Sequence, residues 1–390
     1  MAKLIGNAPN QVPTNADLGS MAFEDKKNYA TISSPIYQPY RNIIINGDMS
    51  IAQRGTSESG ITGDGYYTVD RFKLENSSSG TFTMSQSTDV PSGQGFVNSM
   101  KLDCTTADAS PSYLIFSQRI EGQNLQYLKK GTANAESLTL SFWVKCNETG
   151  TMQVNIFDAD NTRLICKTYT INTADTWEKK TITFAGDTTG TLDNDNARSF
   201  QLEWFLDGGA TYTGGSVTGN WETRDNTNRF AGATINLGDN TSNEWYITGV
   251  QLEVGTTASD FEFLPHDINY ERCLRYYYRL NFGGGLKFAG FAQVDNDNSR
   301  VVGIVPFLKE MRTAPTALEQ SGTAGNYKLR TDGTYSCTGV PTFNTGSVWN
   351  ASVSWVRSGI TSSDGFAINA IMKGGGDGGY LGWSAELWLL

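Results

Sequence analysis

The chain has 390 residues and a net charge of −10, from 30 Lys and Arg against 40 Asp and Glu. This balance disfavours a nucleic-acid partner, because phosphate binding needs clustered basic residues and the sequence has no basic run. The length is sufficient for two or three domains, and 12% aromatic residues together with 42 Gly favour a mainly β protein.

No stretch approaches the roughly 20 apolar residues that a membrane helix needs, so we expect no membrane insertion. Residues 1–6 lack the apolar core of a secretory signal, which predicts synthesis in a cytoplasm. The cysteines are scattered, odd in number and without a metal-type spacing, so we expect free, mostly buried thiols. They are Cys104, Cys146, Cys166, Cys273 and Cys337.

Residues 1–41 are predicted to form an N-terminal arm without a core of its own. Residues 10–19 and 33–40 are rich in Pro, Asn and small residues. Such a segment is either a floppy terminus or an arm that becomes ordered against another subunit. Apolar residues within it favour the second interpretation: Ile5, Leu18, Met21, Phe23, Ile32 and Ile36.

Residues 42–264 are predicted to form an antiparallel β-sandwich, or jelly roll. The apolar, β-branched segments 42–50 and 245–254 are expected to be its first and last strands. Between them, further segments alternate apolar with polar residues and are separated by turn formers, as in sheets with one wet face. These segments are 70–74, 81–85, 99–103, 113–120, 138–145, 152–157, 163–169, 178–184 and 200–206.

Residues 267–280 are predicted to form a helix within a linking segment, 265–285. Pro265 precedes this helix, Asp267 is placed to cap it, and a triple glycine at 283–285 ends it. Residues 286–390 are predicted to form a distal β domain, because β patterning returns in them. Its expected strands include residues 300–307, 348–356 and 365–372. The apolar end, residues 381–390, is expected to be tucked into a core or a subunit interface.

Several segments resemble those of appendage proteins of tailed bacteriophages, above all tail fibres of marine phages and cyanophages. Residues 11–25 (QVPTNADLGSMAFED) resemble the N-terminal segment of these proteins. These proteins share a jelly-roll module that is similar to carbohydrate-binding modules. Three segments of this chain resemble that module: residues 42–50 (NIIINGDMS), 70–72 (DRF) and 247–255 (ITGVQLEVG). The segment that closes the module and the distal domain are resembled by residues 261–265, 271–277, 311–316 and 384–387.

The resemblance implies an elongated homotrimer that is a structural protein of the virion. The arm would attach the trimer to other phage tail or head proteins, and the later domains would meet a host surface glycan. The expected role is viral attachment to the host cell, as a receptor-binding tail fibre. A head fibre, capsid decoration or adaptor protein with a purely structural role is the alternative. The attachment residues implied in the arm are Val12, Pro13, Leu18, Met21 and Phe23.

No catalytic residues are predicted, and we expect a non-enzymatic protein. Glycan hydrolysis would need two carboxylates at a defined separation, and no pattern pairs the many acids of this chain. Glu203 and Asp207 share one face of a predicted strand, for which a structural strand face is the simpler interpretation. The single histidine, His266, follows Pro265 at a helix entry, where a capping or packing role is favoured over a Ser-His-Asp set.

Sugar recognition predicts an aromatic platform flanked by amide and carboxylate groups. The Gly-rich loop 207–225 offers this combination, and loops on a rigid sandwich commonly carry recognition. Aromatic residues of β proteins also serve as core or interface residues, which is the alternative interpretation. The candidate glycan-binding residues are Tyr212, Trp221, Glu222, Arg224 and Asp225.

No cofactor is expected apart from a structural calcium, which sugar-binding sandwich modules often hold between their first and last strands. In this chain the ion would fall at Asn46 and Asp48. Calcium takes roughly six to eight oxygen ligands, carboxylates among them. Thr248 and Gly249 stand where such modules tend to show acids, so the sequence departs from the usual pattern and leaves both outcomes open.

Overall fold

The computed structural model describes residues 40–282, 289, 292–294, 300–330, 334–357 and 379–387. Within these ranges the chain is mainly β with antiparallel sheets, as the composition predicts. The α-helices of this part are short: α2 (Ala210–Thr213) and α3 (His266–Leu274). Its 3-10 turns are η2 (Gly122–Asn124), η3 (Gln126–Leu128), η4 (Asn226–Asn228) and η5 (Ala324–Asn326). None of the described helices has the length and apolarity to cross a membrane.

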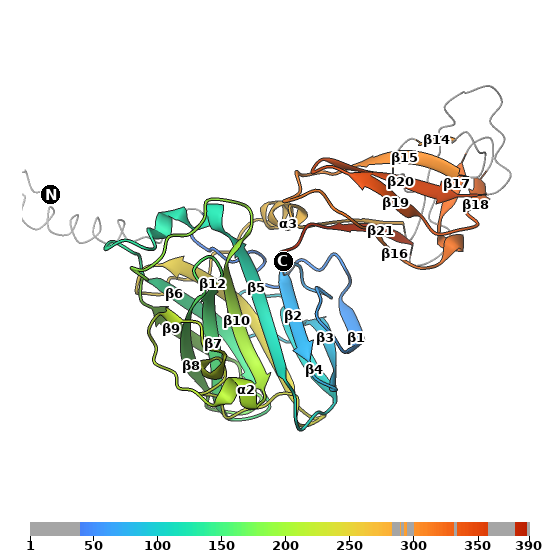
Figure 1. Cartoon of the computed structure of the whole chain (residues 1–390). Coiled ribbons are helices and arrows are strands. Elements are labelled where there is room, and N and C mark those ends of the chain that lie inside the picture. Colours follow the sequence, from blue (N-terminus) through green and yellow to red (C-terminus); the bar gives the residue numbers. More distant parts are fainter. Residues whose placement is uncertain are drawn as a thin grey trace, which may run out of the picture.

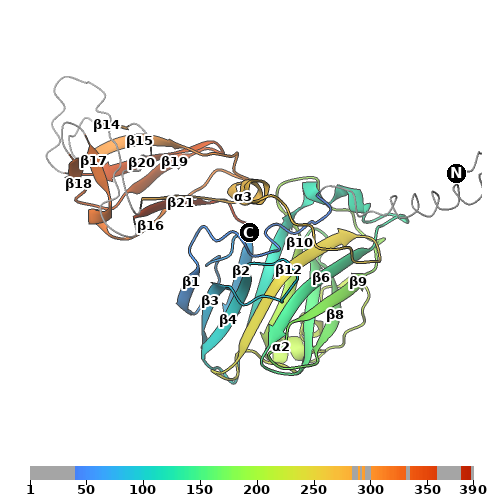
Figure 2. The ribbon, with the colours of Figure 1, turned by 180° about the vertical axis from the view of Figure 1, so that it is seen from behind.

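Among the described residues, two six-stranded sheets pack face to face as a β-sandwich, seen from both sides in Figures 1 and 2. The first sheet has the order β1 (Ser57–Ile61), β3 (Thr81–Ser87), β4 (Ser99–Thr106), β12 (Glu244–Val254), β6 (Leu138–Cys146) and β9 (Glu178–Phe184). The second has the order β11 (Glu222–Thr223), β8 (Arg163–Ile171), β7 (Gly150–Asp158), β10 (Arg198–Gly208), β5 (Tyr113–Glu121) and β2 (Phe72–Ser77). Each strand predicted between residues 70 and 206 is present, within a few residues of its expected ends.

The core of the sandwich follows from the period-two alternation of its strands. In β10, Leu202, Trp204 and Leu206 point inward and are fully buried in one cluster with residues of both sheets. The intervening side chains, such as Gln201 and Glu203, point to the outer face of the second sheet. The sequence of β10 therefore builds the apolar core on one side of the sheet and a buried polar layer on the other.

The segment 42–50 is not a strand, which corrects the prediction. Asn46 and Met49 have φ angles of 61° and 58°, and strands require extended backbone. The amide of Met49 donates to the carbonyl of Asn46 (3.0 Å), so the chain turns at this point. The segment still lies against β12, where the amide of Val250 donates to the carbonyl of Gly47 (2.9 Å). Its predicted partner, residues 245–254, is the confirmed strand β12.

The predicted helix 267–280 is too long at its C-terminal end. Helix α3 ends at Leu274, and β13 (Tyr277–Asn281) follows it and pairs with β21 (Tyr380–Ser384). Aromatic residues favour strands, and the buried ring of Tyr277 lies 3.5 Å beneath the guanidinium of Arg54. Asp267 lies in the first turn of α3, while Pro265 takes the N-cap position.

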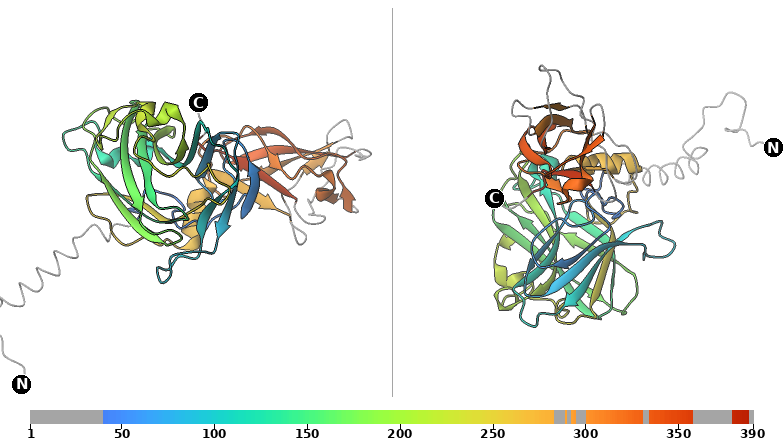
Figure 3. Two further views of the ribbon diagram at one scale, coloured as in Figure 1. Left: turned by 90° about the horizontal axis from the view of Figure 1, so that it is seen from below. Right: turned by 90° about the vertical axis from the view of Figure 1, so that its right-hand side faces the viewer.

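Strand β13 opens a second, smaller β region, which extends away from the sandwich in Figure 3. Its described strands form the sheets β13-β21-β16 (Glu319–Gln320), β14 (Ala292–Val294)-β15 (Arg300–Pro306)-β20 (Asn350–Val356)-β19 (Thr342–Gly346) and β17 (Lys328–Arg330)-β18 (Thr334–Ser336). They enclose a core that includes Tyr278, Trp355 and Trp383. Strands β15 and β20 confirm the predictions at 300–307 and 348–356, and the segment 365–372 lies outside the described residues.

Residues 385–387 run from the end of β21 back to the sandwich. Glu386 is buried against Arg71, and Nη1 of Arg119 donates to the carbonyl of Leu387 (2.5 Å). The side chain of Leu387 packs in a small cluster with Ile45, among others. The expectation that the apolar end is tucked in is therefore confirmed as far as residue 387.

Candidate functional site

The loop predicted to bind a sugar lies across the second sheet, with α2 in front of β10 in Figure 1. Tyr212 belongs to α2, and its ring packs 5.1 Å from that of Phe205 in β10 and 5.8 Å from that of Tyr113 in β5. The side chain is only 8% exposed. The structure thus gives Tyr212 a packing role under the loop, and its contact with a sugar stays a prediction.

Trp221, which directly precedes β11, covers the edge of the main core. Its indole Nε1 donates to the carbonyl of Ala185 (2.7 Å), and its ring centroid lies 5.9 Å from that of Phe200. The ammonium of Lys130 lies 5.7 Å from the same ring. The structure thus gives this half-buried indole a packing role, and its contact with a ligand stays a prediction.

Glu222 and Asp225 hold the loop in shape. The carboxylate of Glu222 accepts from Nδ2 of Asn228 (2.8 Å), across the loop. Asp225 caps the turn η4, because its carboxylate accepts from both the amide and the hydroxyl of Thr227 (2.9 and 2.8 Å). Both acids are therefore occupied by neighbours on the loop.

Arg224 places its charged guanidinium on the sheet face. Its central carbon is 4.6 Å from the ring centroid of Phe157 in β7, and that of Arg198 in β10 is 5.5 Å from the same ring. The buried Nε of Arg224 has no hydrogen-bond partner in the described part of the chain. Arg198 donates to Oε1 of Gln201 (2.9 Å). The two cations thus share one aromatic ring and have no carboxylate partner among the described residues.

Phe157 and Arg198 were missed by sequence reasoning. They lie on β7 and β10, which are separated by some forty residues of sequence and become neighbours only through sheet pairing. The signal in the sequence is that Arg198 begins an alternating strand. Simple alternation would place Arg198 and Gln201 on opposite faces, and the register shift between Arg198 and Phe200 changes this. The sequence could not show that this face meets Arg224.

The middle of the same sheet face is a row of buried, mutually bonded polar side chains. Arg229 holds the carboxylate of Glu203 with Nη2 (2.9 Å), and Arg119 holds that of Glu75 with Nη2 (3.1 Å). Gln201 joins the row, since its Nε2 donates to Glu75 (2.8 Å) and its Oε1 accepts from Nε of Arg119 (3.1 Å). Because each carboxylate of this row has its own arginine, Arg198 and Arg224 leave the face with a positive excess.

The pKa shifts of the charged groups on this sheet face agree with its excess of arginines over carboxylates. Burial and then the neighbouring guanidinium groups lower the pKa of Arg224 and of Arg198, as expected for cations that lack a counter-ion. Burial alone would raise the pKa of Glu75, but the cations of Arg119 and Lys73 hold it below its ordinary value. An acid held ionised in this way is a poor proton donor.

Glu203 and Asp207, the two acids predicted on one strand face, do not form a pair. Glu203 is bound by Arg229, whereas Asp207 accepts a hydrogen bond from the amide of Gly238 (2.9 Å). Burial raises the pKa of Asp207 to about 6. Each acid therefore has a separate structural partner, in agreement with the interpretation as a structural strand face.

The proposed calcium ligands are engaged in protein contacts. Oδ1 of Asn46 accepts from the amide of Ile51 (2.9 Å), and its Nδ2 donates to the carbonyls of Ile51 and Asp70. Oδ1 of Asp48 accepts from Nδ2 of Asn269 (3.0 Å). The described residues contain no group of three His, Cys, Asp or Glu side chains that could hold a metal. The pair therefore braces the turn at 46–49, and calcium binding at these residues stays a prediction.

The five residues predicted for attachment to the particle lie outside the described residues, and their role stays a prediction. They are Val12, Pro13, Leu18, Met21 and Phe23.

No family and no curated protein matches the chain. Among solved structures, a domain of the bacteriophage CBA120 tailspike protein 4 is 13% identical at a TM-score of 0.30, covering 56% of this chain, which spans only 22% of that one. A putative sugar-binding protein of Bacteroides thetaiotaomicron is 13% identical with a TM-score of 0.32, and the match covers 55% of this chain and 100% of that one. A family 11 carbohydrate-binding module of Clostridium thermocellum is 11% identical with a TM-score of 0.27, and the match covers 51% of this chain and 98% of that one. The likeness to carbohydrate-binding modules and to a phage tailspike domain is distant, and values this low assign neither family nor activity.

Proposed function

We propose that this chain is a phage virion protein whose sandwich binds a host surface glycan on the outer face of the second sheet. The observation that carries the proposal is the pair Arg198 and Arg224 on the ring of Phe157, without a carboxylate partner in the described part of the chain. Guanidinium groups match the planar oxygens of carboxylates and phosphates. The preferred ligand is therefore a glycan with an acidic substituent.

The charge distribution supports this choice of ligand. The whole chain carries −10, which by itself would repel an anionic cell surface. On the outer face the local charge is positive, because Glu75 and Glu203 are already paired, whereas Arg198 and Arg224 have no carboxylate partner among the residues that the structure describes. A local positive patch gives an acidic glycan a defined place to bind on an otherwise negative molecule.

The same residues support binding without catalysis. A glycosidase needs one carboxyl group as proton donor and a second as nucleophile or base. Glu75 and Glu203 are instead held by Arg119 and Arg229 in a fixed row. We propose that this row keeps the sheet face rigid while the arginines on Phe157 contact the ligand.

The place of the protein on the particle rests on the sequence resemblance of residues 11–25 and of the sandwich segments to phage appendage proteins. The proposal is a homotrimeric tail fibre attached through residues 1–41. Electron microscopy of virions labelled with an antibody against residues 286–390 tests it. Label at the ends of tail-borne fibres is expected, and label spread over the capsid would instead make the protein a head fibre or decoration.

Glycan binding is tested with a glycan array and then by titration of the glycan that binds best. The double variant Arg198→Ala/Arg224→Ala is expected to lose at least about ten-fold in affinity, because a charge-assisted pair contributes on the order of 1.5 to 3 kcal/mol. Lys309→Ala is the matched control, since it removes an exposed cation far along the chain in the second β region. Unchanged affinity of the double variant, or selective binding of neutral glycans by the wild-type protein, would refute the proposed site.

A further inference from the structure

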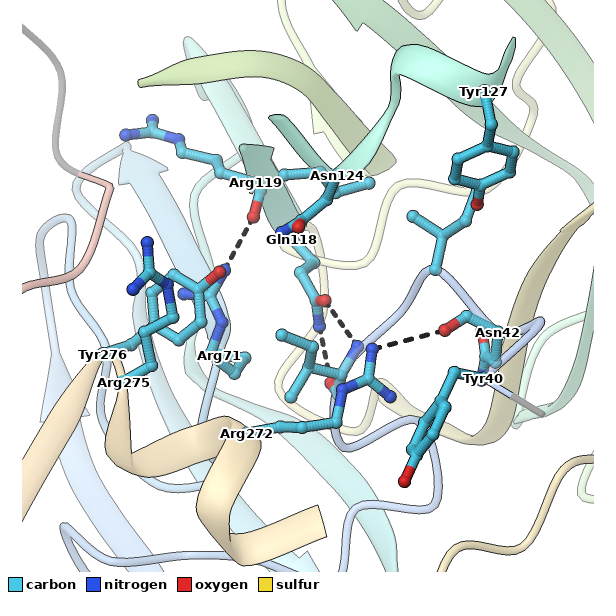
Figure 4. Close-up of a pocket in the computed structure, with 13 residues that line it drawn as sticks. Tyr40, Asn42, Arg71, Gln118, Arg119, Asn124, Tyr127, Arg272, Arg275 and Tyr276 are labelled. Atoms are coloured by element: carbon cyan, nitrogen blue, oxygen red, sulfur yellow. Dashed lines mark hydrogen bonds between the residues drawn. The ribbon is translucent and has the colours of Figure 1, made fainter. Parts of the chain in front are cut away.

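A cavity of about 330 Å³ lies where α3 meets the sandwich. Thirteen residues line it, and Figure 4 draws them. Four of the thirteen are arginines and none is Asp or Glu. In a chain that has more acidic than basic residues, this cavity is a second place where the local charge is reversed.

Most of its arginines already hold a carboxylate in the structure. The pairs are Arg71 with Glu386, Arg119 with Glu75, and Arg275 with Glu121. Arg272 of α3 is the exception among the described residues, since its guanidinium makes a single long hydrogen bond, from Nη2 to the carbonyl of Asn42 (3.3 Å). Burial lowers the pKa of Arg272, which agrees with a cation that lacks a counter-ion. The cavity thus contains one guanidinium for which the described residues provide no carboxylate.

Arg71 adds a second unmet donor to the same cavity. Its side chain is 1% exposed and lies flat on the ring of Tyr276, 3.4 Å from the centroid. Its Nη2 donates to the carbonyl of Arg119 (2.7 Å) and its Nη1 contacts Glu386. Its buried Nε has no hydrogen-bond partner within the described ranges. Buried donors are nearly always satisfied, so this one is consistent with a missing acceptor.

Two tyrosines stand at the rim of the cavity. Tyr40 is 57% exposed and Tyr127 is 50% exposed, so both rings are open to a ligand that enters from solvent. In Figure 4 they lie on one side of the cavity, with Arg272 between them and the residues Arg71 and Tyr276. Tyrosine combines an apolar face with a polar tip, so it suits a ligand that is part hydrocarbon and part hydroxyl.

We propose that this cavity binds a small organic anion, whose acidic group contacts Arg272 and whose body lies between Tyr40 and Tyr127. A carboxylate and a phosphate present similar oxygens to a guanidinium, so the chemical class is an oxyanion. The volume suits a small ligand and not a chain of several sugars. Of the residues named for the outer face of the second sheet, only Arg119 also lines this cavity, so the inference does not depend on glycan binding there.

Isothermal titration of the full chain with inorganic phosphate, with glucuronate and with neutral glucose tests the inference. The wild-type protein is expected to bind phosphate, glucuronate or both, and to ignore glucose. In the Arg198→Ala/Arg224→Ala background, which removes the proposed acidic-sugar contact on the outer sheet face, Arg272→Ala is expected to weaken that binding at least ten-fold, and far-UV circular dichroism serves as the fold check. Tyr127→Ala is expected to weaken the binding of glucuronate more than the binding of phosphate. This difference distinguishes a site for an acidic sugar from a site for a free inorganic anion.

The double variant Arg198→Ala/Arg224→Ala separates the two sites, because the outer sheet face is itself proposed to bind an acidic sugar and none of the residues that line the cavity is changed. Anion binding that survives in this double variant and is lost when Arg272→Ala is added to it supports the cavity, whatever the glycan array shows. Loss of binding in the double variant, with full binding in Arg272→Ala alone, would overturn the inference while leaving the proposed function standing. Binding of neither anion, or equal binding of glucose, would also overturn it.

Discussion

Arg71 and Glu386 form a buried ion pair although 315 residues separate them. Their side chains are 1% and 0% exposed. Burial opposes the charge, yet the carboxylate of Glu386 raises the pKa of Arg71. Arg71 immediately precedes β2 of the sandwich and Glu386 follows β21 of the second β region. The pair therefore fastens the two parts of the chain together at the point where the cavity with Arg272 opens.

Glu386→Ala is expected to destabilise the protein by about 3 to 5 kcal/mol, because it leaves the guanidinium of Arg71 buried without its counter-ion. Urea unfolding followed by tryptophan fluorescence measures the loss. Glu271→Ala is the matched control: its carboxylate pairs with Lys309 at 3.4 Å with both side chains about half exposed or more, so it should cost less than about 1 kcal/mol. Similar losses in the two variants would show that burial of the pair does not matter.

Gly47→Ala is expected to be strongly destabilising, although it adds a single methyl group. A Cβ at Gly47 would lie 2.0 Å from the carbonyl oxygen of Val250, which belongs to the central strand β12 and cannot move aside. Overpacking against a rigid neighbour costs about 1 to 3 kcal/mol or more. Gly63→Ala is the control, since a Cβ there meets nothing within 4 Å. A normal melting temperature for Gly47→Ala would contradict the close approach of segment 42–50 to β12.

The strands of the sandwich could be predicted because alternation is a local property, as in β10 with its inward Trp204 and outward Glu203. The segment 42–50 has the composition of a strand, but Asn46 has a positive φ, and its side-chain Nδ2 donates to the carbonyls of Ile51 and Asp70. The bond to Asp70 is a tertiary contact, which the pattern of the segment alone does not show. The tyrosine run after Leu274 likewise becomes a strand because β21 is there to pair with it.

The candidate site was less predictable than the fold, because it depends on which side chains the sheet brings together. The loop pattern identified Arg224 but ranked it with Tyr212, which lies under the loop and not on it. Whether an aromatic ring covers a core or faces water is decided by the neighbouring strands. Phe157 and Arg198 come from two such strands, so the position of Arg224 gave no information about them.

All five thiols are expected to resist Ellman's reagent in the native protein at pH 8 and to react once it is unfolded. They are free and buried, as the sequence predicted. Burial raises the pKa of each, to about 11 for Cys104 and Cys337 and to about 12 for Cys166, so little reactive thiolate forms. Titration with and without denaturant counts the thiols, and rapid native labelling of any of them would contradict the packing around it.

Asp207 gives the stability a pH dependence of defined sign. Burial raises its pKa from 3.8 to about 6 in the native state, so the native protein binds a proton that the unfolded chain has already released. Stability therefore falls as the pH rises from about 4 to 6 and then levels off. Asp207→Asn removes the titrating group and keeps an amide oxygen for the N–H of Gly238, so its stability should fall less across this range, by about 1 to 2 kcal/mol. Urea unfolding at pH 4 and pH 7 measures the difference.

Asp225→Asn is the control for that measurement. The hydrogen bonds from Thr227 lower the pKa of Asp225. Its contribution to stability therefore has the opposite sign: it increases with pH and is complete once the pH exceeds the ordinary pKa of a carboxyl group. This variant should keep the full fall in stability between pH 4 and pH 6, because Asp207 is still present. If Asp207→Asn and the wild-type protein instead lose the same stability over that interval, another buried acid dominates. Asp70 is then the group to replace next, since burial raises its pKa to about 6 as well.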